Sequence, residues 1–229
     1  MAAGKKKSRK ELLKEPDVVL TWSTRLLALA TAYQNAILIG LIGLLAAAAL
    51  FSGYRYYVHR QEAQAGVLLE QALAKHERLR AGGTAAAAVQ GVADDFQRIF
   101  ASYASRSNAD AARLVYANLL YAAGDFEKAA EHYRALLDRF GEFPLIRFQV
   151  IKSLGYTQAA LRDEAGAART FETALAAADP RLADGVLYAL GRLYARMGEA
   201  EKSRALFQRI LSDHPSSTYA ALAKQQLSF

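Results

Sequence analysis

The sequence contains no cysteine and only four proline and four histidine residues among its 229. Without cysteine there is neither a disulfide nor a lipid-modified N-terminal cysteine, which is consistent with an oxidising compartment. A zinc site would need histidine and carboxylate ligands from distant segments, because the histidines show no ligand spacing: His59, His76, His132 and His214. We therefore expect no metal and no cofactor.

Catalytic motifs are also scarce. No segment is convincing as a strand, so no glycine-rich phosphate loop follows one, and Gly82-Gly83 is typical of a turn. Asp94 and Asp95 are adjacent, but neighbours on a helix point about 100° apart, which favours a solvated face over an acid–base pair. The sequence favours a protein that is not an enzyme and has no small-molecule substrate. The alternative, an enzyme, would require a polar pocket with paired titratable groups.

The net charge of +7 is concentrated at one end of the chain. Residues 1–60 contain nine lysines and arginines against three acids, whereas residues 61–229 contain 20 bases and 19 acids. Nucleic-acid binding would need a basic face on the folded part, and that part is nearly neutral. We therefore expect no nucleic-acid partner.

One long uncharged run, from Ala36 to Tyr54, follows the basic end. Its 19 residues would span about 28 Å as a helix, close to the hydrocarbon thickness of a bilayer. Seven bases precede this run and only Arg55 and Arg60 follow it closely. The positive-inside rule then predicts a cytoplasmic N-terminus and a C-terminal domain across the membrane. We expect a single-pass membrane protein whose C-terminal domain lies across the membrane from the cytoplasm.

A cleavable signal peptide is the competing interpretation of this run, with Ala47 and Ala49 resembling a cleavage site. The run is preceded by 35 residues, which is longer than a usual signal-peptide n-region. An uncleaved anchor is therefore favoured. Before it, apolar residues recur at helical spacing from Val18 to Tyr33, which predicts an amphipathic helix on the cytoplasmic leaflet. The alternative is an N-terminal extension of the membrane helix.

The second half of the chain contains a repeat. Ala117, Gly155 and Gly191 occupy equivalent places, 38 and 36 residues apart. Each is followed by a helix that carries an aromatic residue, with Phe171 and Phe207 in the second and third units. We expect the small residue to admit the aromatic ring between paired helices. Gly124 and Gly198 are expected to end the first helix of their units.

This pattern resembles the tetratricopeptide repeat, a helix–turn–helix unit of about 34 residues. The fold class is thus predicted as all-α, with one transmembrane helix followed by a tetratricopeptide-like solenoid of antiparallel helix pairs. Three positions depart from the pattern: Ala117 replaces a glycine, Arg162 replaces the turn glycine, and Ser203 replaces an alanine. The expected organisation is a basic cytoplasmic tail (1–15), an amphipathic helix (16–34), a transmembrane helix (35–58), a helical linker with a degenerate first pair (59–107), and repeats with a terminal capping helix (108–229).

The resemblance implies a binding groove lined by the first helix of each unit. The family's groove positions fall on Leu114, Asn118, Tyr121, Gln149, Lys152, Tyr156, Tyr188, Arg192 and Arg196. Three tyrosines with basic residues favour an extended peptide or an acidic partner segment. The alternative is that Tyr121 and Tyr156 only pack against neighbouring helices. Leu114 stands where the carboxylate clamp of chaperone-binding repeats needs a lysine, so that clamp is not expected.

The layout of tail, single anchor and repeat domain resembles the ancillary subunit family of the bacterial Sec translocon. That resemblance implies a single-pass protein of the bacterial inner membrane with its C-terminal domain in the periplasm. It also implies a non-enzymatic role in binding secreted or envelope proteins near the translocon. A dedicated scaffold or assembly factor for one membrane or envelope complex remains open.

Overall fold

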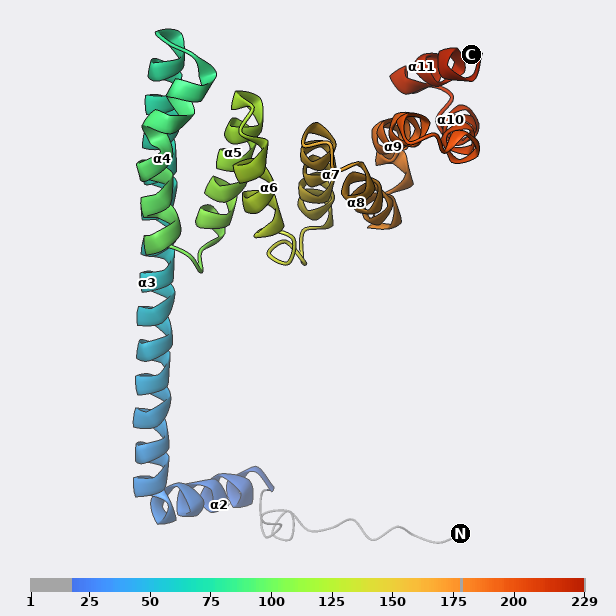
Figure 1. Ribbon diagram of the computed structural model, residues 1–229. Coiled ribbons are helices and arrows are strands. Elements are labelled where there is room, and N and C mark those ends of the chain that lie inside the picture. Colours follow the sequence, from blue (N-terminus) through green and yellow to red (C-terminus); the bar gives the residue numbers. More distant parts are fainter. Residues whose placement is uncertain (1–17, 178, 229) are drawn as a thin grey trace, which may run out of the picture. The chain divides into compact units, whose positions relative to one another are not determined.

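The computed structural model describes residues 18–177 and 179–228, and these are helices joined by short connections, with no strand among them (Figure 1). The chain divides into two compact units after Val58. The predicted basic tail at 1–15 lies outside the described residues.

The described part of the first unit contains α2 (Val18–Ala32) and the beginning of α3 (Gln34–Ala81). A turn at Tyr33 separates them. By length and composition, α3 is the one described helix that could cross a membrane, with a mean hydropathy of 2.3 over its most apolar window and none of that window buried. The large apolar side chains of this segment are exposed, including Leu50 and Phe51.

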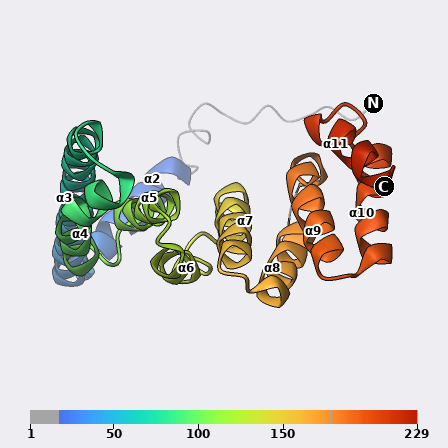
Figure 2. The same ribbon diagram turned by 45° about the horizontal axis from the view of Figure 1, so that its top comes forward.

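The second unit is a series of helix pairs: α4 (Ala85–Ser102), α5 (Ser107–Ala123), α6 (Phe126–Arg134), α7 (Pro144–Ala160), α8 (Glu164–Ala177), α9 (Asp184–Arg196), α10 (Ala200–Asp213) and α11 (Thr218–Leu227), with a 3-10 turn η1 (Pro180–Leu182). In Figure 2, α5, α7 and α9 follow one another in one row, and α6 and α8 lie in a second row. The predicted tetratricopeptide-like solenoid is confirmed.

The end of α3 and α4 form the first pair of this unit. Ala72 of α3 is buried with Val92 and Phe96 of α4 in one apolar cluster. The Lys75 ammonium lies 2.7 Å from the Asp95 carboxylate across the pair. The helix α3 ends before Gly82-Gly83, and the Thr84 hydroxyl caps α4 by accepting from the Ala87 amide at 3.2 Å.

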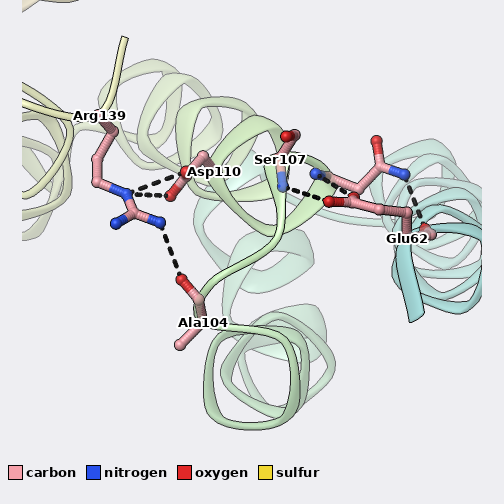
Figure 3. A network of polar contacts seen from close by, with 6 residues as sticks. Glu62, Ala104, Ser107, Asp110 and Arg139 are labelled. Atoms are coloured by element: carbon pink, nitrogen blue, oxygen red, sulfur yellow. Dashed lines mark hydrogen bonds and ion pairs between the residues drawn. The ribbon is translucent and has the colours of Figure 1, made fainter. Parts of the chain in front are cut away.

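A carboxylate from α3 caps the start of α5 (Figure 3). Arg106, the N-cap residue of α5, offers no side-chain cap. Instead, Glu62 accepts from the backbone amides of Ser107 and Asn108 at 2.8 and 3.0 Å. The Asn108 side-chain amide donates back to the Glu62 carbonyl at 2.7 Å. A negative charge on exposed helical amides is favourable, so this cap joins the first pair to the next one.

A second polar junction holds the connection after α6, also drawn in Figure 3. The Arg139 guanidinium donates to both oxygens of Asp110 at 3.0 Å and to the Ala104 carbonyl at 3.1 Å. Asp110 belongs to the first turn of α5. The longer connection between α6 and α7 is thereby tied to the start of α5, the first helix of the same repeat.

Close contact between a glycine and a phenylalanine sets the spacing of the later pairs. A Cβ atom on Gly155 would lie 2.7 Å from the Phe171 ring, and one on Gly191 would lie 2.7 Å from the Phe207 ring. Both rings are buried. The role predicted for these small residues is therefore confirmed, and Ala117 is also fully buried in the first repeat.

The turn inside each repeat pair uses a left-handed residue. Gly124 and Gly198 end α5 and α9 with φ of 85° and 80°. Arg162, in the corresponding turn between α7 and α8, adopts a φ of 63° although it has a side chain. The second repeat thus keeps the turn of its neighbours, at a conformational cost of about 1–2 kcal/mol.

The predicted terminal helix is present as α11. The Ser217 hydroxyl caps it through the Tyr219 amide at 3.0 Å. Tyr219 packs against Tyr188 of α9, with ring centroids 5.3 Å apart. Ala220 and Ala223 are buried in the last apolar cluster, so α11 covers the end of the final pair.

We expect Gly191→Ala to destabilise the repeat unit by about 1–3 kcal/mol, because the added methyl group would overlap a buried ring. Gly91→Ala is the matched control: its Cβ would meet only the tip of Leu79, which is 40% exposed and can rotate away. Urea unfolding of the full chain in detergent, followed by circular dichroism, measures both variants. Equal midpoints for the two would contradict the spacing role of Gly191.

His132 packs inside an aromatic cluster of the first repeat. Its ring centroid lies 5.4 Å from that of Phe100 and 5.1 Å from that of Tyr116. Arg113 lies over the Phe100 ring at 4.4 Å, and its Nη1 is 3.4 Å from His132 Nδ1. Burial lowers the pKa of His132, and the Arg113 guanidinium lowers it further, while Glu131 opposes this. The folded state therefore favours the neutral imidazole more than the unfolded chain does.

The sign of the pH dependence follows from that depressed pKa. Unfolded histidine has a pKa of about 6.5, so below this pH the unfolded chain binds a proton that the folded chain excludes. We expect the free energy of unfolding to fall from pH 7.5 to 5.5 by less in His132→Gln than in the unsubstituted chain. Urea unfolding at both pH values measures this, and His59→Gln, at an exposed position, should leave the fall unchanged.

Candidate peptide-binding groove

The residue that follows each small packing residue faces the groove. Successive helical residues are turned by about 100°, so Arg192 points away from the contact made by Gly191. Tyr156 is turned from Gly155 by the same angle and meets the edge of the Phe171 ring that Gly155 also contacts. Asn118 has the same relation to Ala117. The packing contacts thus decide which side chains of α5, α7 and α9 line this face.

Asn118, Tyr121 and Tyr156 line a first cavity of about 150 Å³ between α5 and α7. Two further residues, Tyr133 and Ser153, complete its wall. The Tyr133 hydroxyl donates to Asn118 Oδ1 at 2.6 Å. Burial raises the pKa of Tyr133 to about 12, so the hydroxyl stays protonated at neutral pH. This cavity offers neutral hydrogen-bonding groups.

Tyr156, Tyr188, Arg192 and Arg196 line a second cavity of about 300 Å³ between α7 and α9. Phe171 and Leu193 form its apolar wall. The second cavity therefore combines aromatic surface with two guanidinium groups.

Tyr156 is the wall between the two cavities. Its ring meets the Phe171 ring edge-on, with centroids 5.1 Å apart and planes at 75°. Its hydroxyl donates to the Gly185 carbonyl at 3.4 Å. Burial raises the pKa of Tyr156 to about 12. Held from both ends, this side chain divides the groove without itself carrying charge.

The two arginines of the second cavity differ in their partners. Arg196 Nε lies 3.2 Å from a Glu164 carboxylate oxygen, contributed by the first turn of α8. Arg192 is exposed and forms no ion pair within the described part of the chain. The cavity thus presents one unpaired cation.

The predicted groove residues fall into three groups. Asn118, Tyr121, Tyr156, Tyr188, Arg192 and Arg196 line the two cavities. Lys152 lines neither and lies over the Phe148 ring with its Nζ 5.5 Å from the centroid. Leu114 packs against the first apolar cluster, and Gln149 donates to the Ser153 hydroxyl at 3.4 Å. That these side chains bind a partner stays a prediction.

The packing alternative describes part of the same geometry. Tyr156 packs on Phe171, and the Tyr121 ring lies 5.2 Å from that of Phe126, yet Tyr121 remains 37% exposed. Sequence reasoning missed Tyr133, Ser153 and Glu164. Tyr133 could have been found, because it occupies the aromatic position of the first repeat. No sequence spacing relates Glu164 to Arg196.

A larger hollow of about 500 Å³ lies apart from the groove, where Pro144 and Leu145 face η1. Its charged residues, Asp179 and Arg181, pair with each other at 2.7 Å. It therefore offers no unsatisfied group to a ligand. Among the described residues, no cluster of three histidine, aspartate or glutamate side chains has the arrangement of a metal site.

Fold and groove together define a helical-repeat module of the kind that mediates protein–protein interactions. The family model described as a tetratricopeptide repeat-like domain matches residues 30–227, and the chain belongs to this family.

One solved structure supports the fold, and two others align less closely. A tetratricopeptide repeat protein from Parabacteroides merdae aligns with a TM-score of 0.56 at 16% identity, covering 69% of this chain and 58% of that one. MamA aligns with a TM-score of 0.49 at 16% identity, covering 67% of this chain and 84% of MamA. The pilF protein of Pseudomonas aeruginosa aligns with a TM-score of 0.47 at 15% identity, covering 71% of this chain and 82% of that one. This chain thus spans less than two thirds of the Parabacteroides protein. Comparison with curated protein sequences yields no match.

Proposed function

We propose that this chain is a membrane-anchored periplasmic module that binds polypeptide segments in the groove of its repeats. The observation that carries the proposal is the pair of adjoining cavities lined by Tyr121, Tyr156 and Tyr188. Aromatic side chains with nearby cations supply contact area and charge recognition, the features that dominate binding energy at protein interfaces. The family's general role in protein binding supports this assignment.

In this proposal, residues 35–58 cross the bacterial inner membrane once, with the 1–15 tail in the cytoplasm and the repeats in the periplasm. The length and apolar character of this part of α3 support the crossing. The excess of bases before it supports the orientation. In the same scheme, α2 lies on the cytoplasmic leaflet, with the exposed side chain of Trp22 at headgroup level.

The proposed clients are secreted or envelope proteins near the Sec translocon, as the resemblance to its ancillary subunit family implies. The second candidate is a dedicated scaffold for one membrane or envelope complex, which the same groove would serve. The two differ in stoichiometry: a client-binding protein contacts many polypeptides, whereas a scaffold contacts one constant partner.

We expect photo-crosslinkers at positions 156 and 192 to capture polypeptides in intact cells, because both side chains line the second cavity. Mass spectrometry identifies what is captured. A crosslinker at Arg169, an exposed position of α8 that lines neither cavity, is the matched control. Capture at position 169 with none in the groove would overturn the groove assignment. Many products favour clients, and one stoichiometric product favours the scaffold.

We expect a compartment-sensitive reporter fused after Phe229 to be active in the periplasm, and the full-length chain to stay in the membrane after carbonate washing. The charge asymmetry around 36–54 gives the reason. A soluble product shortened at its N-terminus would indicate a cleaved signal peptide. A reporter active only in the cytoplasm would show the opposite orientation.

A further inference from the structure

We propose that the second cavity is selective for acidic segments: it seats an apolar side chain between Tyr156 and Tyr188 while a neighbouring carboxylate pairs with Arg192. This inference rests on the proposed function and specifies the chemistry of its ligand.

The apolar half of this site is a preformed recess. Phe171 and Leu193 line it and are almost fully buried, and Tyr156 and Tyr188 flank it. Tyr188 is itself held between the rings of Phe207 and Tyr219, with centroids 5.8 and 5.3 Å away. A volume of about 300 Å³ is at the small end of ligand pockets, which suits a side chain better than a whole cofactor. Fixed aromatic walls reduce the entropy lost when a side chain enters.

The charge at the mouth of the recess favours an anion. Arg192 makes no ion pair in the described part of the chain, whereas Arg196 Nε pairs with a Glu164 carboxylate oxygen at 3.2 Å. Arginine presents a planar fork of donors that matches a carboxylate in two parallel hydrogen bonds. A carboxylate arriving beside the recess would therefore meet one unpaired guanidinium and one that Glu164 only partly neutralises.

Another acid near this wall, Asp184, is held by hydrogen bonds to groups other than Arg192. Its two oxygens accept from the Ser217 hydroxyl at 2.6 Å and from the Gly185 amide at 2.8 Å. It precedes Arg192 by eight positions on α9, about 12 Å along the helix, which exceeds the screening length of about 8 Å at physiological salt. Arg192 and Arg196 are the two charged residues that line this cavity, and Glu164 pairs with the second of them.

Fluorescence anisotropy with the full chain in detergent tests the selectivity. The probes are three fluorescein-labelled serine–glycine decapeptides with amidated ends. Each carries one leucine, followed by glutamate in the first, glutamine in the second and lysine in the third. We expect the glutamate peptide to bind about tenfold more tightly than the glutamine peptide, since a charged hydrogen bond is lost. We expect the lysine peptide to bind more weakly still.

Four variants separate charge from packing. Arg192→Leu should weaken binding of the glutamate peptide about tenfold and leave the glutamine peptide unchanged. Glu164→Gln should raise the affinity for the glutamate peptide about threefold by releasing Arg196, an effect that loss of packing would not give. Tyr188→Ala should weaken both peptides. Arg169→Leu, the matched control on the exposed face of α8, should alter neither.

Two outcomes would overturn the inference in distinguishable ways. Equal affinity for the glutamate and glutamine peptides, lost together in Tyr188→Ala, would remove the acidic preference and leave the peptide-binding groove standing. No binding of any of the three peptides at millimolar concentration would overturn both the preference and the groove.

Discussion

The contact between a helical glycine and a buried phenylalanine ring is the constraint on which the repeats depend. At Gly155–Phe171 and Gly191–Phe207 there is no room for a side chain on the glycine. The ring therefore fixes both the distance between paired helices and the rotation of the first helix. Because rotation is fixed, the next residue along the chain must face the groove. The positions of Tyr156 and Arg192 follow from the packing of the glycines that precede them.

The elements that recur in the sequence could be predicted from it, and those that depend on a single partner could not. Glycine and phenylalanine at matching offsets predicted the helix pairs, and glycine at 124 and 198 predicted the turns. Arg162 broke that pattern, yet the turn formed, because the packed helices α7 and α8 outweigh the strain of one residue. The cap from Glu62 to the start of α5 joins residues that no repeat spacing relates.

The residues of the candidate groove likewise include some that the sequence predicted and some that it did not. Family positions gave the residues on α5, α7 and α9, because these share one helical face. They did not give Glu164, which reaches Arg196 from α8, or Tyr133, which reaches Asn118 from α6. Lys152 lies on the predicted helix but over Phe148, since its long stem can follow apolar surface. Side chains from the second helix of a pair therefore contact and orient groove residues that come from the first helices.

The adjacency of a packing residue and a groove-facing residue has an evolutionary consequence. Substitutions at 118, 156 or 192 alter the surface offered to other molecules, while their neighbours at 117, 155 and 191 keep the scaffold intact. Recognition can then diverge between descendants of one ancestral array faster than architecture does. Paralogues that retain the glycines and exchange the following residue would be natural places to look for altered partner preference.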